Sequence, residues 1–359
     1  VGLSLSVSFV VRADINDPLI QAALHDFFIS TGAESWADAV EGGWSSNPAV
    51  NIPCTAYGLT CDSVGNLIKM DFVDYSNSKS IAGPLPESFG DLGTLESINL
   101  QRTRINGAIP ASFGQLSELI YFKGSSDKGF SSIPTEFGNL VKLVEADFSG
   151  NNCTISALPA SFGNLVNLRK LLLKNCDLTT LPAEFANLSS LQELKLDLNR
   201  FESLPNAIYG LTNLKELSAR QNFIEVIPSD ISALVNLRSL RLQQQSVNAP
   251  LISLPNELGD LPQLTYLDVS NNQLTSLPEG LFNSISLSYL DASKNKLMNL
   301  SSNIGQLTTL NYLLLQNNEI PAIPITIGTL VNLTNFDVSY NKIDGIPSAF
   351  GNLVNISGA

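Results

Sequence analysis

The sequence predicts an α/β solenoid, a fold in which one short unit repeats along the chain and packs on its neighbours. Three observations indicate it: leucines recur at positions one, four and six of a unit, asparagine recurs at position nine, and the spacing of units is nearly constant at 23 to 28 residues. The first leucines are Leu67, Leu95, Leu119, Leu143, Leu168, Leu191, Leu214, Leu237, Leu264, Leu287, Leu310 and Leu333. We therefore expect twelve repeats over residues 67–355, and Ile356 begins a truncated thirteenth over residues 356–359.

The repeat that begins at Leu264 shows the pattern most clearly. Residues 264–278 read LTYLDVSNNQLTSLP, which fits L-x-x-L-x-L-x-x-N-x-L-x-x-L-P. This pattern resembles the leucine-rich repeat, whose fold is a horseshoe. The resemblance implies a parallel β-sheet on the concave side. The outer segments, such as residues 159–165, are short and contain glycine, so we expect irregular structure, 3₁₀ pieces or single helical turns on the convex side.

Residues 1–13 have two interpretations. Apolar residues alternate with serines from Leu3 to Val11, which is the pattern of a half-buried strand. The same stretch, followed by Arg12 and Ala13, resembles the end of a secretory signal. Both interpretations stay open.

Residues 14–66 predict a cap on the repeat array. Asp17-Pro18 is a favourable helix start, and Gly32 is a plausible end. Between them one apolar face is expected from Leu19, Ile20, Ala23, Leu24, Phe27 and Phe28. The helix, the tryptophans Trp36 and Trp44, and the following two cysteines resemble the N-terminal cap of plant-type extracellular leucine-rich repeat proteins.

That resemblance implies a disulfide between Cys54 and Cys61. The chain departs from the family pattern at Tyr57, where the family favours tryptophan, and by one extra residue between the cysteines. A cap is needed because the first repeat would otherwise expose its hydrophobic end.

The ninth positions form a predicted internal ladder of polar side chains. They should satisfy backbone groups where the chain leaves each strand, which is a structural role. The members are Asn151, Cys176, Asn199, Asn222, Gln245, Asn272, Asn295, Asn318 and Asn341. Cys153 and Cys176 lie in neighbouring repeats, so they could form a second disulfide, or Cys176 could simply be a small buried ladder residue.

Composition excludes several functions. The chain has 20 Lys+Arg against 33 Asp+Glu and a net charge of -13, which argues against general binding to nucleic acids. No apolar run reaches the roughly 18 residues that a membrane span needs. The only histidine, His25, is expected to face solvent on the cap helix, and no His/Cys cluster has metal-ligand spacing. We therefore expect no enzyme, no metal and no cofactor.

Five Asn-x-Ser/Thr sequons occur, at Asn152, Asn187, Asn299, Asn332 and Asn355. Together with the cap cysteines they favour a secreted or cell-surface glycoprotein. Asn152 is the best candidate for glycosylation, because it lies beside the ladder.

Strand residues at positions three and five should face the concave side and provide a ligand-binding surface. A tyrosine strip with acids beside it suits a protein, peptide or glycan ligand, although the acids could also serve only to keep the sheet soluble. The candidate residues are Lys170, Lys174, Lys195, Arg220, Arg238, Arg241, Tyr266, Asp268, Tyr289, Asp291, Tyr312 and Asp337. An insertion at residues 243–250 could add a specificity loop or be a tolerated surface insertion.

Two functions compete. The first is an extracellular recognition module that binds its ligand on the concave face. The second is a structural subunit of an assembly, in which the uncapped C-terminal end of one copy meets the N-terminal strand of another and builds a filament.

Overall fold

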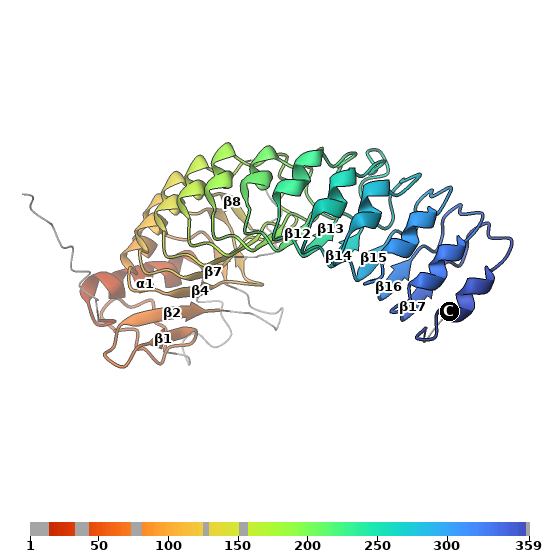
Figure 1. Ribbon diagram of the computed structural model, residues 1–359. Helices are drawn as coiled ribbons and strands as arrows, with labels where there is room; N and C mark the ends of the chain where they lie inside the picture. Colours follow the sequence, from red (N-terminus) through yellow and green to blue (C-terminus); the bar gives the residue numbers. More distant parts are fainter. Residues whose placement is uncertain (1–13, 33–42, 73–80, 125–128, 151–156, 357–359) are drawn as a thin grey trace, which may run out of the picture. The chain divides into compact units, whose positions relative to one another are not determined.

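The computed structural model describes residues 14–32, 43–72, 81–124, 129–150 and 157–356. The chain divides into two compact units, residues 1–146 and residues 147–359. In each unit, strands line one side and short 3₁₀ helices line the other, as Figure 1 shows.

The first unit opens with the cap helix α1, Pro18–Ser30. It begins where the sequence predicts, because the Asp17 side chain accepts a hydrogen bond from the Leu19 amide at 2.8 Å. Phe27 and Phe28 are buried against the Trp44 ring, at centroid distances of 6.1 and 5.9 Å. The predicted apolar face is wrong only for Leu19, which lies on the exposed side of the helix. Trp36 is outside the described residues.

The rest of the cap ties this helix to the first repeat. Strand β1, Leu59–Cys61, pairs antiparallel with β2, Leu67–Asp71, and Cys61 forms the expected disulfide with Cys54. The prediction that His25 faces solvent is wrong, since its side chain is only 5% exposed. Its Nδ1 lies 2.8 Å from the carbonyl oxygen of Ser45, so the histidine joins the helix to the loop that carries Trp44.

Parallel strands continue the sheet in the first unit. After β2 come β4 (Ser97–Asn99), β7 (Tyr121–Lys123) and β9 (Glu145–Asp147). The outer side carries η2 (Glu87–Asp91), η3 (Ala111–Gln115) and η4 (Thr135–Asn139). Two small parallel sheets were not expected, and they pair β3 (Ala82–Gly83) with β5 (Arg104–Ile105), and β6 (Gly107–Ala108) with β8 (Phe130–Ser132).

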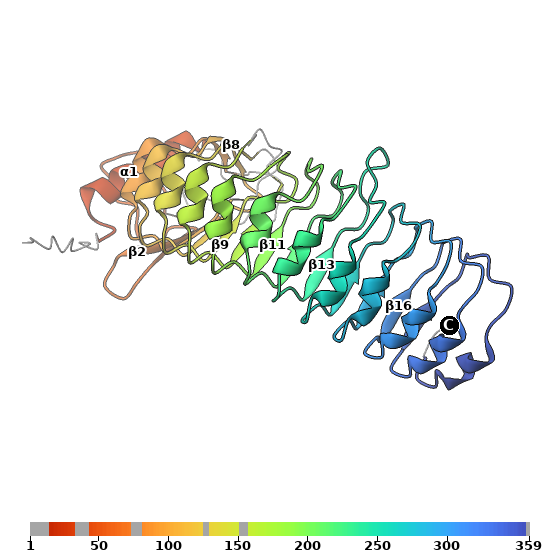
Figure 2. The same cartoon turned by 45° about the horizontal axis from the view of Figure 1, so that its top comes forward.

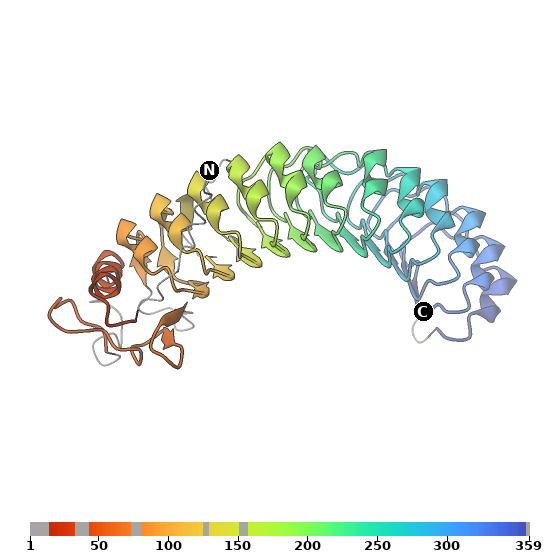
Figure 3. The ribbon, with the colours of Figure 1, turned by 60° about the vertical axis from the view of Figure 1, so that its left-hand side comes forward.

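The second unit contains eight parallel strands in sequence order. They are β10 (Lys170–Leu172), β11 (Glu193–Lys195), β12 (Glu216–Ser218), β13 (Ser239–Arg241), β14 (Tyr266–Asp268), β15 (Tyr289–Asp291), β16 (Tyr312–Leu314) and β17 (Asn335–Asp337). Each pairs without a register shift, so equivalent positions of successive repeats stand side by side. Figure 3 shows these strands along the inner side of the second unit.

Nine 3₁₀ helices form the outer side of the second unit within its described residues, in agreement with the prediction. They are η5 (Ala160–Asn164), η6 (Ala183–Asn187), η7 (Asn206–Gly210), η8 (Ser229–Ala233), η9 (Asn256–Asp260), η10 (Glu279–Asn283), η11 (Ser302–Gln306), η12 (Ile325–Thr329) and η13 (Ser348–Asn352).

Phenylalanine and glycine set the spacing of the first of these helices. The rings of Phe162 and Phe185 stack at 5.9 Å inside the solenoid. Gly163 lies so close to the next turn that an added Cβ would approach the Glu184 carbonyl oxygen to 2.4 Å. A larger residue at position 163 would therefore push neighbouring repeats apart.

The predicted polar ladder is present from Cys176 to Asn341, while Asn151 lies outside the described residues. The Asn199 side-chain amide donates to the carbonyl oxygens of Leu173 and Leu196, at 2.7 and 2.9 Å. Its Oδ1 accepts from the amides of Cys176 and Leu178, at 3.0 and 3.1 Å. One asparagine thus satisfies backbone groups of two repeats, and similar bonds are made by Asn222, Gln245, Asn272, Asn295, Asn318 and Asn341.

Candidate ligand-binding face

The strand register of the second unit builds three columns of side chains on the concave face. Position three supplies Lys170, Glu193, Glu216, Ser239, Tyr266, Tyr289, Tyr312 and Asn335. Position five supplies Leu172, Lys195, Ser218, Arg241, Asp268, Asp291, Leu314 and Asp337. Position seven follows each strand and supplies Lys174, Asp197, Arg220, Gln243, Ser270, Ser293, Gln316 and Ser339.

Three lysines among the candidate binding residues, Lys170, Lys174 and Lys195, form ion pairs within the face. Glu193 lies 2.5 Å from Lys195 Nζ and 3.5 Å from Lys170 Nζ. Partial burial opposes ionisation of Glu193, but the hydrogen bonds and charges of the two lysines outweigh it and hold the Glu193 pKa below its usual range. The charges at this end of the face therefore largely compensate one another.

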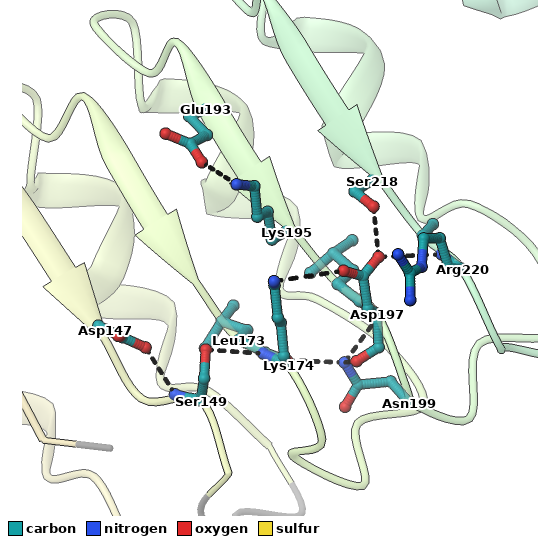
Figure 4. A network of polar contacts seen from close by, with 12 residues as sticks. Asp147, Ser149, Leu173, Lys174, Glu193, Lys195, Asp197, Asn199, Ser218 and Arg220 are labelled. Atoms are coloured by element: carbon teal, nitrogen blue, oxygen red, sulfur yellow. Dashed lines mark hydrogen bonds and ion pairs between the residues drawn. The ribbon is translucent and has the colours of Figure 1, made fainter. Parts of the chain in front are cut away.

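A second network surrounds Asp197, as Figure 4 shows. Its carboxylate lies 3.7 Å from Lys174 Nζ, accepts a short hydrogen bond from the Ser218 hydroxyl, and accepts from the Arg220 amide at 3.1 Å. Arg220 Nε is buried and has no hydrogen-bond partner among the described residues. Arg238 precedes β13 at position two and is exposed, so it lies outside the three columns.

The three tyrosines form a column of rings on β14, β15 and β16. Tyr266 and Tyr289 are stacked with centroids 4.3 Å apart and an angle of 8° between their planes. Tyr312 continues the column, with its ring centroid 5.6 Å from that of Tyr289, and 44% of Tyr312 is exposed to solvent. The Arg241 guanidinium carbon lies 4.6 Å from the Tyr266 centroid, which closes the other end with a cation–π contact.

Aspartates stand beside this column at position five. The Oδ1 atoms of Asp268, Asp291 and Asp337 each accept a hydrogen bond from the backbone amide of the serine two residues later, at 3.1, 2.9 and 2.9 Å. Asp268 is only 7% exposed. Burial and the nearby Asp291 charge raise the Asp268 pKa, although the Ser270 hydrogen bonds and Arg241 act in the opposite direction.

The insertion projects from the second unit as a loop after β13 (Figure 2). Gln245 keeps the ladder intact, because its Nε2 donates to the carbonyl oxygens of Ala219 and Leu242 at 2.9 Å. The loop then turns through Ser246, whose amide donates to Asn222, and leaves Val247 exposed. A specificity role for this loop stays a prediction.

The sequons differ in their surroundings. Asn152 and Cys153 are outside the described residues, so glycosylation of Asn152 and a disulfide to Cys176 stay predictions. Asn187 and Asn299 are exposed. The Nδ2 atoms of Asn332 and Asn355 donate to backbone carbonyls of the preceding repeat at 2.8 Å.

Two residues of the face were not among the candidate binding residues. Leu314 occupies the position-five column between two aspartates, and Gln316 follows it with a buried Oε1 that has no partner among the described residues. The column assignment already placed Leu314 on this face, but leucine is so common in the repeat that it gave no separate signal.

Comparison with known families decides the classification. The description "Leucine-rich repeat region" matches residues 147–245, and "Leucine Rich Repeat" matches residues 263–284 and 332–353. The chain is a leucine-rich repeat protein. No curated protein sequence matches this leucine-rich repeat protein.

Solved structures similar to this leucine-rich repeat protein include plant receptor ectodomains. The ectodomain of the Arabidopsis thaliana receptor kinase GASSHO1/SCHENGEN3, in complex with CASPARIAN STRIP INTEGRITY FACTOR 2, has a TM-score of 0.75 and 25% identity. The alignment covers 94% of this chain and 43% of that chain. The plant peptide hormone receptor RGFR1 in complex with RGF2 has a TM-score of 0.67 and 26% identity, covering 83% and 55%.

A bacterial protein is similar as well. The leucine-rich repeat protein of Leptospira interrogans has a TM-score of 0.63 and 25% identity, covering 76% of this chain and 79% of that one. This chain therefore spans about half the length of the two plant ectodomains but most of the bacterial protein.

Two features are absent from the described part of the chain. No helix there is both long and apolar enough to cross a bilayer. No group of three or more His, Cys, Asp or Glu side chains in the same residues could hold a metal ion.

The alternative of a filament-forming structural subunit stays a prediction. It depends on the N-terminal strand, and residues 1–13 are outside the described residues.

Proposed function

We propose that this leucine-rich repeat protein is a non-catalytic recognition module, and that it binds a protein or peptide on the concave face of its second unit. The observation that carries the proposal is the tyrosine column of Tyr266, Tyr289 and Tyr312, with aspartates along one side. Stacked tyrosines offer a large rigid contact area with polar tips, and they lose little side-chain freedom on binding.

The face is also rigid enough to be preformed. Every strand that carries it is hydrogen-bonded to its neighbours in register, and the ladder asparagines fix the turn after each strand. A ligand would therefore meet side chains that are already ordered, which lowers the entropic cost of binding.

The comparisons support this class of ligand. Two of the similar plant ectodomains are receptors in complexes with the peptide hormone RGF2 and with CASPARIAN STRIP INTEGRITY FACTOR 2. A glycan ligand, the remaining class expected from the sequence, gains no support from them.

We further propose that the protein acts outside the cell. The Cys54–Cys61 disulfide in the cap is typical of chains that mature in an oxidising compartment. The similarity to receptor ectodomains supports the same location.

Peptide selection tests the proposed function. A phage-displayed random dodecapeptide library is selected on the immobilised full chain, and selected peptides are retested on a variant in which all three column tyrosines are Ala. We expect enriched peptides that bind the wild-type chain and lose binding to the variant. Peptides that bind both chains equally would overturn the proposal, provided that circular dichroism shows the variant to be folded.

A further inference from the structure

The concave face of the second unit has two halves that differ in charge compensation. In the half with β10 and β11, Glu193 and Asp197 each lie within 4 Å of a lysine Nζ. In the half with β14 to β17, no ion pair to Asp268, Asp291 or Asp337 occurs among the described residues. The three aspartates of the second half are therefore not directly paired with a cation in the described part of the chain.

The lysines of this half are engaged elsewhere or face another way. Lys296 donates to Gln273 at 2.8 Å, and Lys342 pairs with Glu319 at the same distance. Lys294 occupies position eight, where the backbone turns left-handed after β15. Arg241 contacts the Tyr266 ring at the far end of the tyrosine column.

One spot on this surface combines all the contacts that a long cationic side chain needs. Leu314 on β16 lies between Asp291 on β15 and Asp337 on β17 in the position-five column. Tyr312 precedes Leu314 on the same face, and its ring is the exposed end of the tyrosine column.

We propose that four residues, Asp291, Tyr312, Leu314 and Asp337, form a site, the Leu314 site, that binds a lysine or arginine side chain of the protein or peptide ligand. The inference rests on the proposed function and specifies the chemistry of its ligand. The aliphatic stem would lie on Leu314 and the Tyr312 ring, because long cationic side chains bury their methylenes against apolar surface. The charged head would lie between the carboxylates of Asp291 and Asp337 and donate to their oxygens.

The chain already contains the aromatic half of this contact. Arg241 holds its guanidinium against the Tyr266 ring, so the first tyrosine of the column has an internal cation, whereas 44% of the last, Tyr312, is exposed. The ligand cation would do at Tyr312 what Arg241 does at Tyr266.

A bare metal ion fits this site poorly. Neighbouring strands lie about 4.8 Å apart, so Asp291 and Asp337 are roughly 10 Å apart at their Cα atoms. Their Oδ1 atoms are each held by the amide of Ser293 or Ser339, and Leu314 lies between them. Metal ligands must approach one ion to about 2.3 to 2.6 Å for calcium, whereas a lysine or arginine head can bridge a wider gap.

The test uses the peptides selected on the full chain. Each lysine of a selected peptide is replaced by glutamine and each arginine by citrulline, and affinities are measured by fluorescence polarisation for the wild-type chain and for D291N/D337N. Asparagine retains the Oδ1 that accepts the serine amide, so this variant should fold. E257Q/D260N, on the outer helix η9, is the control that removes the same charge.

We expect one replacement in each peptide to weaken binding to the wild-type chain and the control variant about tenfold, and to D291N/D337N less than about twofold. If binding depends on the tyrosine column but on no lysine or arginine, this inference fails and the proposed function stands. If binding is independent of the tyrosine column, the proposed function fails. A library that yields no binder contradicts both.

Discussion

The ring of Tyr289 lies parallel to the ring of Tyr266 at a centroid distance of 4.3 Å, and this contact has a titration consequence. Burial raises the Tyr289 pKa above its ordinary value, and the charges of Tyr266 and Asp291 raise it further. We expect the tyrosinate absorbance of the wild-type chain to include a group that ionises above the ordinary tyrosine pKa of about 10. Burial also raises the Tyr209 pKa, so the late component should shrink by one tyrosine in Y289F and keep the contribution of Tyr209. An unchanged amplitude in Y289F would contradict the assignment to Tyr289.

The same shift affects stability at high pH. The neutral phenol is favoured in the folded state, so its stabilising contribution is complete below the ordinary pKa and is lost as the pH rises through the folded-state pKa. Y289F should therefore lose less stability than the wild-type chain on alkaline titration, as measured by urea unfolding.

Loss of a single ladder asparagine should lower the free energy of unfolding substantially. N199A would leave the carbonyls of Leu173 and Leu196 without their side-chain donor, and the amides of Cys176 and Leu178 without their acceptor. We expect a loss of about 3 kcal/mol in the free energy of unfolding, because unsatisfied buried groups are costly. A control, N299A, removes an exposed asparagine outside the ladder and should leave the unfolding midpoint nearly unchanged. Equal midpoints for the two variants would contradict the assigned role.

A substitution at Leu198, at position eight of its repeat, should stabilise the chain. This residue has a φ of 59° and is 46% exposed, so it is strained without a packing benefit to compensate. L198N should raise the free energy of unfolding by about 0.5 to 1 kcal/mol, because asparagine tolerates the left-handed region.

The reverse change is the control. Asn271 has the same conformation, with a φ of 56°, and N271L should lower stability by a similar amount. Thermal unfolding of both variants measures the effect, and shifts of the same sign would show that backbone conformation is not its cause.

Glu193 and Asp268, which lie in different halves of the concave face, should contribute to stability with opposite pH dependence. The Glu193 pKa is lowered, so its ion pairs stabilise the fold above the unfolded-state pKa of about 4.3, and the contribution is lost as the pH falls through the folded-state pKa. E193Q should destabilise the chain at pH 7 by about 1 kcal/mol, since the pair is only partly buried, and should have little effect near pH 3.

Asp268 should behave in the opposite sense. Its pKa is raised, so its favourable contribution exists below the unfolded-state pKa of about 3.9 and is lost as the pH rises through the folded-state pKa. D268N keeps an acceptor for Ser270 and should stabilise the chain by roughly 1 kcal/mol at pH 7, but not near pH 3. Urea unfolding at both pH values measures the change in the free energy of unfolding. Destabilisation by D268N at pH 7 would contradict the stated environment of this carboxylate.

Most of the fold could be predicted from the sequence because every repeat contains the same pattern of leucines and a polar ladder residue. Leucines at fixed spacing define the strands, and position nine identifies Asn199 and its equivalents as ladder residues. The cap helix begins at Pro18 as predicted, because the Asp17 side chain caps a free amide of the first helical turn.

Contacts between side chains of different repeats were harder to predict. The sequence indicates Lys170, Lys174 and Lys195 as candidate binding residues, but it does not show that their long side chains reach acids in the same or the next repeat. Burial of His25 depends on the loop that brings the Ser45 carbonyl to the helix, and a repeat pattern contains no information about that loop.

The affinity of a selected peptide for two variants tests the central claim most directly. Y266A/Y289A/Y312A removes the tyrosine column from the concave face, and V235A/I285A/V331A removes three exposed apolar side chains outside it. Concave-face recognition predicts a loss of at least about 30-fold for the tyrosine variant and less than about twofold for the other. Unchanged affinity for a folded tyrosine variant would contradict the account and place the ligand on another surface.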